Sequence, residues 1–213
     1  MAEIRRLPER ALADRSELNL ILDSARVATL STVEGGLPLV VPLLFARDGD
    51  RLLLHGSTGA GALRLAATGA PIALSVALLD GLVYADSLFH SSANYRSAVV
   101  TGVAQVLDGE EAQRGLDRLA EVLMPGRRAE VRGHLAKELA ATLTLALAIR
   151  DDNWTAKRRI GGPGEIEDPG VWSGVLPLNR TWGEPVSEPG AADEVSPSVR
   201  ALAGRPVSPG RPD

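Results

Sequence analysis

The feature that most constrains the fold is a series of short strand-like runs between residues 26 and 107. The first three, RVATLSTV, LPLVVPLLFARD and RLLLHGS, are separated by EGG and DGD, in which glycine supplies the positive φ of a tight turn. Two longer runs follow, PIALSVALLDGLVYA and YRSAVVTGVAQVL. Five strands in succession predict a barrel or a sandwich.

Helical patterns flank and interrupt these strands. Apolar residues at helical spacing predict an amphipathic helix from Pro8 to Ala25, a short helix over residues 59–69, and a longer one that begins after Asp108 and ends at a Pro-Gly pair. A further helix is expected over RAEVRGHLAKELA. The alternating run TLTLALAI, Thr142–Ile149, is then a sixth strand that closes the sheet.

The segment from Gly183 onward differs in composition from the rest of the chain. It carries six of the fourteen prolines and almost no large apolar residues. Such a segment cannot bury enough surface to offset its ordering entropy. We therefore expect one domain over residues 1–182 and a disordered, proline-rich tail over residues 183–213.

Composition restricts the classes of function. A chain of 213 residues with 45% apolar content can bury a proper core. The formal net charge of −4, with no basic stripe, argues against nucleic acid as a partner. The absence of cysteine excludes disulfides, thiolate metal sites and a cysteine nucleophile. Neither a signal peptide nor a membrane-spanning run is recognisable, so we expect a cytoplasmic protein without a membrane partner.

The glycine-rich segment HGSTGAGALRLAATG suggests an anion site. Gly56 and Gly61 have the spacing of a nucleoside-triphosphate loop, but the required lysine and hydroxyl residue are absent. A Rossmann site fails as well, because Arg64 stands where the third glycine is needed. What remains is a site for one phosphate monoester, formed by the hydroxyls of Ser57 and Thr58, a helix N-terminus and Arg64. The alternative is that Ser57 or Thr58 only caps the helix while Arg64 points to solvent.

A second cluster of donors, HSSANYRS at residues 90–97, stands directly before the apolar run Ala98-Val99-Val100. Short polar side chains favour turns, whereas the apolar run is typical of a buried strand. We therefore expect the donors to lie on a loop at the mouth of a strand, where they could form a site. The alternative is a structured turn with a surface arginine.

The order of four segments resembles the pyridoxamine 5′-phosphate oxidase-like flavin-binding proteins. Among these, the resemblance is strongest to the branch that includes the nitroimidazole-resistance proteins. The segments are VATLSTVEGGLPLVVPL, LLLHGSTGAGALRLAATG, GLVYADSLFHSSANYRSAVVTGVAQVL and AKRRIGGPGEIEDPGVWSGVLPL. The elements HGSTG and HS-x-x-NYRS-x-V are the most specific parts. The resemblance implies a mainly β fold with flanking helices, a six-stranded antiparallel split β-barrel that pairs as a homodimer and binds FMN in a groove at each end of the dimer interface.

The resemblance also implies roles for individual residues around the flavin. The matched positions are Thr29, Leu30 and Ser31 beside the isoalloxazine; His55, Gly56, Ser57 and Thr58 at the ribityl phosphate, with Arg64 as its cation; Asn94, Tyr95 and Arg96 on a loop that reaches the partner subunit's flavin; and Lys157 at a late basic position near the site. No catalytic side chain and no metal ligand is expected, because the flavin itself carries the redox chemistry.

These features predict an FMN-dependent oxidoreductase that reduces a small electrophilic or aromatic compound with electrons from a reduced nicotinamide. Vitamin B6 oxidation is not expected, because the arginine- and histidine-bearing C-terminal motif of the true oxidases is replaced by the proline-rich tail. Three alternatives on the same fold stay open: a deazaflavin-dependent reductase, a non-catalytic flavin or haem binder or sensor, and a structural dimer without ligand. For haem, His55, His90 and His134 are available, but their spacing does not favour iron.

Overall fold

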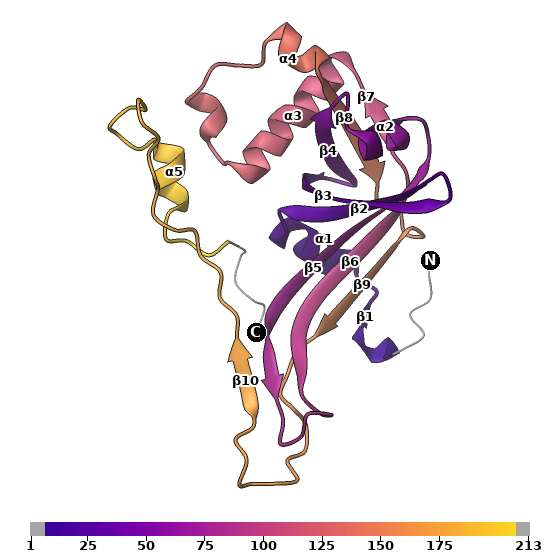
Figure 1. The fold of residues 1–213 in the computed structure, drawn as a ribbon, viewed down its shortest axis with the longest axis vertical. Helices are drawn as coiled ribbons and strands as arrows, with labels where there is room; N and C mark the ends of the chain where they lie inside the picture. The colour runs from indigo at the N-terminus through magenta and orange to yellow at the C-terminus, as the bar shows by residue number, and fades with distance from the viewer. Residues whose placement is uncertain (1–6, 208–213) are drawn as a thin grey trace.

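The computed structural model describes residues 7–207 of the chain (Figure 1). Within these residues, ten strands form one antiparallel sheet in the order β1-β9-β6-β5-β2-β3-β4-β8-β7, and β10 pairs with β5. The strands are β1 (Ala11–Leu12), β2 (Val27–Glu34), β3 (Leu37–Asp48), β4 (Arg51–Ser57), β5 (Pro71–Tyr84), β6 (Ser92–Val103), β7 (Gln105–Leu107), β8 (Thr142–Ala148), β9 (Trp154–Arg159) and β10 (Gly174–Pro177). This open, curled sheet with flanking helices is consistent with the expected split barrel.

The helices are α1 (Arg15–Ser24), α2 (Gly61–Ala67), α3 (Gly109–Leu123), α4 (Ala136–Ala140) and α5 (Pro197–Leu202), with short 3-10 turns η1 (Pro8–Arg10) and η2 (Arg127–Ala129). The runs predicted as strands all occur as strands, but β1, β9 and β10 were not predicted, so the described sheet has more than the expected six. β9 was missed because its sequence, WTAKRR, is basic and carries no apolar run.

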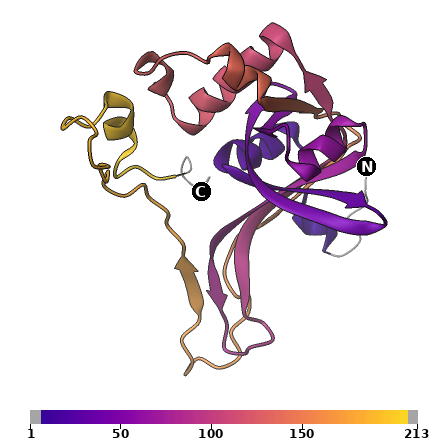
Figure 2. The same ribbon diagram turned by 45° about the horizontal axis from the view of Figure 1, so that its top comes forward.

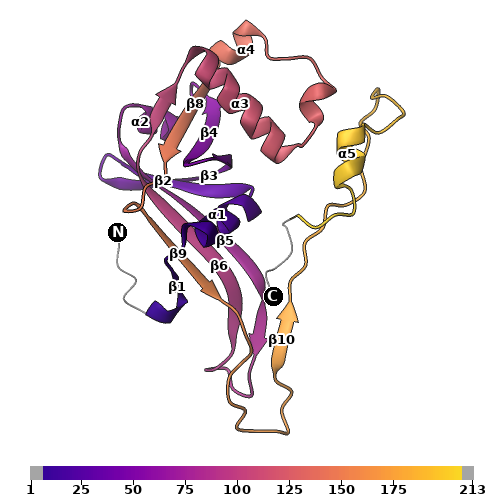
Figure 3. The same cartoon turned by 180° about the vertical axis from the view of Figure 1, so that it is seen from behind.

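Two apolar clusters lie on opposite faces of the sheet. The larger fills the inside of the barrel, where α1 and α2 pack against strands β2 to β6; Leu30, Phe45 and Leu54 are fully buried there. The smaller lies under α3, where Leu116 and Leu119 contact Leu53 and Ala146. Figure 3 shows α1 on the side of β5 and β6 away from the viewer of Figure 1. Both faces of β4 and β8 are therefore covered.

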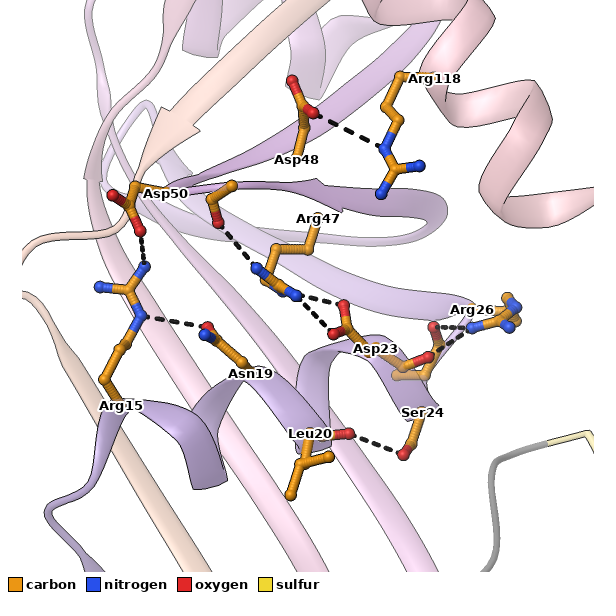
Figure 4. A network of polar contacts seen from close by, with 12 residues as sticks. Arg15, Asn19, Leu20, Asp23, Ser24, Arg26, Arg47, Asp48, Asp50 and Arg118 are labelled. Atoms are coloured by element: carbon orange, nitrogen blue, oxygen red, sulfur yellow. Dashed lines mark hydrogen bonds and ion pairs between the residues drawn. The ribbon is translucent and has the colours of Figure 1, made fainter.

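The position of α1 is set by its first residues and by ion pairs to the β3–β4 hairpin. Asp14 caps the helix by accepting the N–H of Ser16 at 2.8 Å, which lowers the pKa of that carboxyl. The Arg15 Nη2 donates to Asp50 at 2.7 Å, and Arg47 donates to both oxygens of Asp23 (Figure 4). Since Asp23 and Arg47 form a bidentate pair, the helix has one fixed orientation on the hairpin.

The helix predicted over residues 128–140 is wrong for most of its length. Only η2 and the short α4 are helical there, and the chain between them is irregular. Gly133 weakens helix formation in this segment. The Glu138 carboxylate accepts the backbone N–H of Leu135 at 2.9 Å, so α4 begins at that point rather than continuing from η2.

The chain after β9, residues 160–207, forms an extended arm that stands away from the barrel (Figure 2). β10 pairs with the far end of β5, and α5 then lies beside η2. The Glu130 carboxylate accepts the N–H of Ser198 at 2.8 Å and its hydroxyl at 2.6 Å, and Arg127 donates to Ser196 at 2.8 Å. Within the proline-rich segment from Gly183, the structure thus describes helix α5 and polar contacts to residues 127–130, and the disorder of this tail stays a prediction.

None of the helices in residues 7–207 is both long enough and apolar enough to span a bilayer.

Candidate functional site

The predicted residues of β2 divide between the two faces of the sheet. Leu30 is fully buried in the barrel core, so it is a packing residue. Its neighbours Thr29 and Ser31 point the other way, because successive side chains of a strand alternate. In the ladder, Thr29 lies opposite Ser75 of β5, and Ser31 lies opposite Val40 of β3. Thr29 and Ser31 therefore belong to the outer face of the barrel.

This outer face extends over β3, β2, β5, β6 and β9 and combines hydroxyl groups with exposed apolar side chains. Val27, Val33, Val40 and Leu44 are 53, 61, 55 and 47% exposed. The register adds Ser75, Ser97, Tyr95 and Lys157 to the same face. An apolar surface dotted with hydrogen-bonding groups is the usual lining of a site for a planar organic cofactor.

The predicted anion site lies where β4 leads into α2. Ser57 accepts the N–H of Gly59 at 3.2 Å, and α2 begins after Ala60 without a side-chain cap. The alternative is therefore wrong about the helix cap, although Arg64 is exposed as it expected. Arg64 is exposed and borders a shallow cavity of ≈ 210 Å³. Glu34 lines the same cavity and would repel an anion, so Arg64 is only partly favourable for a phosphate.

Gly56 has a packing role that the structure makes explicit. A Cβ at this position would lie 2.4 Å from Cδ1 of Leu63, a buried side chain of α2. A larger residue here would force the Leu63 side chain to move. The glycine of the HGSTG element is thus explained by helix packing, whatever ligand the element holds.

His55 is a half-buried imidazole that has no hydrogen-bond partner among residues 7–207. Its Nδ1 is buried and unbonded, and burial lowers the pKa of the ring, so the imidazole is neutral at pH 7. Thr144 lies directly opposite in the β4–β8 ladder, is 1% exposed, and its Oγ1 is also buried without a partner. Two unsatisfied polar atoms on facing residues are rare in a core and indicate a functional position.

The predicted loop position of Arg96 is wrong. It lies within β6, not on a loop, and its side chain is only 9% exposed. Its Nε and Nη2 donate to the two oxygens of Asp80 at 2.9 and 2.8 Å, and its Nη1 donates to Ser24 at 3.3 Å. Because this guanidinium is buried and paired with Asp80, it stabilises the fold and is not the surface arginine of the alternative interpretation.

Asn94 and Tyr95 are also in β6, so neither lies on the expected loop. Asn94 is fully buried; its Nδ2 donates to the carbonyl of Gly161 at 3.1 Å and its Oδ1 accepts from Nη1 of Arg159 at 2.6 Å. Tyr95 is paired in register with Arg159, on the outer face. Of the predicted residues, the structure therefore brings Thr29, Ser31, Tyr95 and Lys157 onto one face and leaves Leu30, Asn94 and Arg96 on the other.

The actual loop between β5 and β6 comprises residues 85–91. Its tip carries Leu88 and Phe89, which are 95 and 90% exposed. His90 Nδ1 is 3.1 Å from Oγ of Ser87, within this loop. The sequence patterns did not predict that Leu88 and Phe89 form an exposed apolar loop tip.

A second cavity, of ≈ 270 Å³, lies between the end of α3 and the arm. It is lined by Met124, Arg127, Trp182, Gly183, Pro185, Ser198, Val199, Leu202 and Ala203. Most of these residues belong to the arm, so the cavity exists only while the arm is docked.

Comparison with known proteins decides the family. A model of the pyridoxamine 5′-phosphate oxidase family matches residues 14–156. The chain belongs to this family. The predicted resemblance is thereby confirmed, and the fold agrees with it. No curated protein matches the chain.

Three solved structures are similar to the chain. It is 42% identical to the FAD and haem binding protein from Mycobacterium smegmatis, covering 94% of this chain and 100% of that one with a TM-score of 0.90. It is 29% identical to the flavocytochrome Anf3 from Azotobacter vinelandii, covering 95% and 96% with a TM-score of 0.85. A Bacteroides thetaiotaomicron protein named for 5-nitroimidazole antibiotic resistance shares the fold, at 20% identity over 69% of this chain and 85% of that one with a TM-score of 0.59.

Proposed function

We propose that the protein is a redox protein that binds a flavin and a haem. The observation that carries this proposal is the 42% identity, along 94% of the chain, to a protein described as binding FAD and haem. The flavocytochrome from Azotobacter vinelandii supports it over a similar span. The proposal keeps the flavin of the original prediction and adds the haem that was one of its alternatives.

The outer face offers suitable contacts for the flavin. Thr29, Ser31 and Ser75 present hydroxyl groups across neighbouring strands, and the valines beside them provide apolar surface for a ring. We expect the flavin phosphate near Ser57, Thr58 and Arg64, as the resemblance implied. FMN was the predicted form, whereas the similar protein from Mycobacterium smegmatis is described with FAD, so the identity of the flavin is part of the test.

His55 is the residue that best fits the haem iron. An axial histidine must be neutral, and burial lowers the pKa of this ring. Nδ1 of His55 makes no hydrogen bond within residues 7–207, not even to Thr144 directly opposite, so this nitrogen is not committed to another described side chain. His90 is exposed and contacts Ser87, and His134 is 3.5 Å from Asp117, so neither has these properties.

We also propose that the protein is a homodimer that pairs through the outer face. Val27, Val33, Val40 and Leu44 leave this face too apolar for free solvent, and a second copy could cover it. A cofactor lying between two such faces would be shielded from water by both subunits. Sedimentation velocity at micromolar concentration tests this: a dimer is expected, and a monomer alone would refute it.

The proposed reaction is electron transfer to a small acceptor, with a reduced nicotinamide as electron donor. A bound flavin would supply hydride and electron transfer, and a bound haem would supply single-electron exchange. The residues of this chain would position both groups and limit access of water. In particular, the apolar side chains of the outer face would lower the polarity around a flavin bound there.

The absorption spectrum of the purified protein tests the cofactors. We expect flavin bands together with a Soret band, and chromatography of the flavin released on denaturation distinguishes FMN from FAD. The variant His55→Gln should lose the Soret band and keep the flavin, while the control His90→Gln should keep both. A protein that takes up neither added flavin nor added haem would refute the proposal, and an unchanged Soret band in His55→Gln would remove His55 from it.

A further inference from the structure

The loop between β5 and β6 presents an exposed apolar tip, Leu88 and Phe89, which are 95 and 90% exposed. The hydroxyl of Ser91 donates to the carbonyl of Ser87 at 2.8 Å across the base of the loop. The ring of Phe89 packs edge-on against that of His90, with the ring centroids 5.2 Å apart. Because these contacts already order the loop, burying its tip in a partner costs little conformational entropy.

The base of this loop carries negative charge. Asp86 accepts the backbone N–H groups of Asp168 at 2.8 Å and Glu167 at 2.5 Å, which joins the loop to residues 161–170. These two bonds hold the pKa of the Asp86 carboxyl below its usual range. Glu165 adds a fourth carboxylate, and neither loop contains lysine or arginine. Such a surface is repelled by an anionic membrane and attracted by a cationic partner.

The cavity between the end of α3 and the arm has the complementary character. Its lining is apolar apart from Arg127 and Ser198, and its volume is ≈ 270 Å³. An apolar cavity of about 150 Å³ already holds benzene, so this one has room for an aromatic side chain. Arg180 and Arg205 are exposed on either side of Trp182 in the arm, and the backbone N–H of Trp182 donates to the carbonyl of Arg205 at 2.9 Å.

Two carboxylates also stand near the cavity. Glu130 pairs with Arg127 at 3.2 Å, and Glu184 is exposed between two residues of the lining. Against Arg127, Arg180 and Arg205, they leave the rim with a net positive charge. An apolar hollow with a positive rim therefore matches an apolar tip with a negative base.

The tip and the cavity lie at opposite ends of the molecule. Figures 1 and 3 show the β5–β6 loop at the lower end, whereas the end of α3 and the helix α5 lie in the upper part. A chain therefore cannot place its own tip in its own cavity. A two-fold axis lets each of two copies fill the cavity of the other, and it leaves no tip over to recruit a third copy.

We propose that, in the dimer, Leu88 and Phe89 of each copy occupy the cavity between α3 and the arm of the other copy. The site is incomplete in one chain, because its apolar walls, which include Met124 and Trp182, are closed only by the partner's tip. Since most of the lining belongs to the arm, arm docking and subunit pairing stabilise each other. The inference rests on the homodimer of the proposed function, but on neither cofactor.

Disulfide cross-linking tests this pairing directly, because the chain has no cysteine of its own. Full-length Leu88→Cys and Val199→Cys proteins are prepared separately, one with a mass tag, then mixed, left to exchange subunits and oxidised. A disulfide needs Cα atoms about 4.4–6.8 Å apart, so a covalent dimer with one copy of each is expected. Leu88→Cys alone should give none, because the two tips lie at opposite ends of such a dimer.

The matched control mixes Leu88→Cys with Asp152→Cys. Asp152 is exposed in the turn between β8 and β9 and does not line the cavity, so no covalent dimer is expected. Equal yields from the two mixtures would mean that the tip reacts by random collision and would overturn the inference.

Sedimentation measures what the tip contributes to pairing. The double variant Leu88→Ser, Phe89→Ser should raise the dissociation constant of the dimer by about tenfold or more, the loss typical of buried apolar anchors. The control Leu37→Ser removes a leucine that is 72% exposed at the start of β3 and should leave the constant unchanged. Circular dichroism checks that each variant folds, and an unchanged constant in the double variant would overturn the inference.

The outcomes separate this inference from the proposed function. A wild-type dimer that binds flavin and haem, but whose variants form no disulfide between tip and cavity, would overturn the inference alone. That disulfide in a protein that takes up neither cofactor would refute the proposed function and support the inference. Binding to phosphatidylcholine vesicles that Phe89→Ser abolishes, without the disulfide, would assign the tip to a membrane and overturn the inference.

Discussion

The barrel and the arm of residues 160–207 differ in what holds them in place. The barrel is closed by apolar side chains that are fully buried, such as Leu30, Phe45 and Leu54, and by the buried pair of Arg96 and Asp80. The arm is held by the β10 ladder, by the hydrogen bond that Arg127 donates to Ser196, and by the one that Ser198 donates to Glu130. The hydrogen bonds that hold the arm can break one at a time, so we expect the arm to detach while the barrel stays folded.

The same division separates the chain's relatives. The family model ends at residue 156, before the arm begins, and the structure named for nitroimidazole resistance covers 69% of the chain. The two flavin-and-haem relatives cover 94 and 95%, which includes most of the arm. The arm is thus an addition to the family's barrel that this chain shares with proteins of that kind.

Removing one member of the buried ion pair should have the largest effect on the barrel. Asp80→Asn leaves the Arg96 guanidinium buried and unpaired, which costs about 3–5 kcal/mol in the free energy of unfolding. Denaturant unfolding monitored by circular dichroism measures it. The control Asp152→Asn, in an exposed 3.6 Å pair, should change stability little. Equal stabilities of the two variants would contradict the role assigned to the pair.

A pair of glycine variants tests the contact of α2 with β4. Gly56→Ala places a Cβ against Leu63, and the overpacking should cost about 1–3 kcal/mol of unfolding free energy. At Gly61, the first residue of α2, a Cβ meets nothing within 4 Å, so Gly61→Ala should be neutral or stabilising. Thermal unfolding of both variants measures the two changes in stability, and a Gly56→Ala protein as stable as the wild type would show that Leu63 moves aside.

A smaller and local effect is expected when the arm loses a contact. Ser198→Ala removes the hydroxyl that donates to Glu130, so amide hydrogens of α5 should exchange faster while the barrel's unfolding midpoint stays unchanged. Ser187→Ala, in an exposed part of the arm, serves as the matched control. Should the midpoint of Ser198→Ala fall as far as that of Gly56→Ala, the arm and barrel would form one cooperative unit.

The smallest predicted effect is a pH dependence of the arm's attachment. The hydroxyl and N–H of Ser198 lower the pKa of Glu130 in the folded chain. The contact therefore stabilises docking fully above the carboxyl's unfolded pKa and is lost as pH falls through the lower, folded value. Trp182, which lines the cavity between arm and α3, can report this by fluorescence. Trp182 fluorescence that stays constant through the acid range would show that other contacts keep the arm attached.

Sequence patterns predicted the barrel well because its strands alternate or run apolar and its turns contain glycine. The same patterns failed at residues 94–96, where short polar side chains suggested a loop. The partners that bury Arg96 and Asn94 are Asp80, Gly161 and Arg159, which only the folded sheet brings close. A polar residue buried by distant partners leaves no local signal.

The candidate site was predictable only where its residues follow the alternation of a strand. Thr29 and Ser31 alternate with a buried leucine, so their face follows from the strand period. The special environment of His55 depends on Thr144, far along the chain. It cannot be obtained from spacing, because it is a property of the completed ladder.

The pairing of β10 with β5 has a consequence for how the chain tolerates cleavage. β2 pairs with β5 only at residues 73–75, and β10 takes up the hydrogen-bonding edge of residues 81–84 further along. A protease cut that released the arm would expose that edge as an unpaired template, beside the apolar tip of Leu88 and Phe89. The clipped protein should then associate edge to edge and precipitate, although its barrel remains folded.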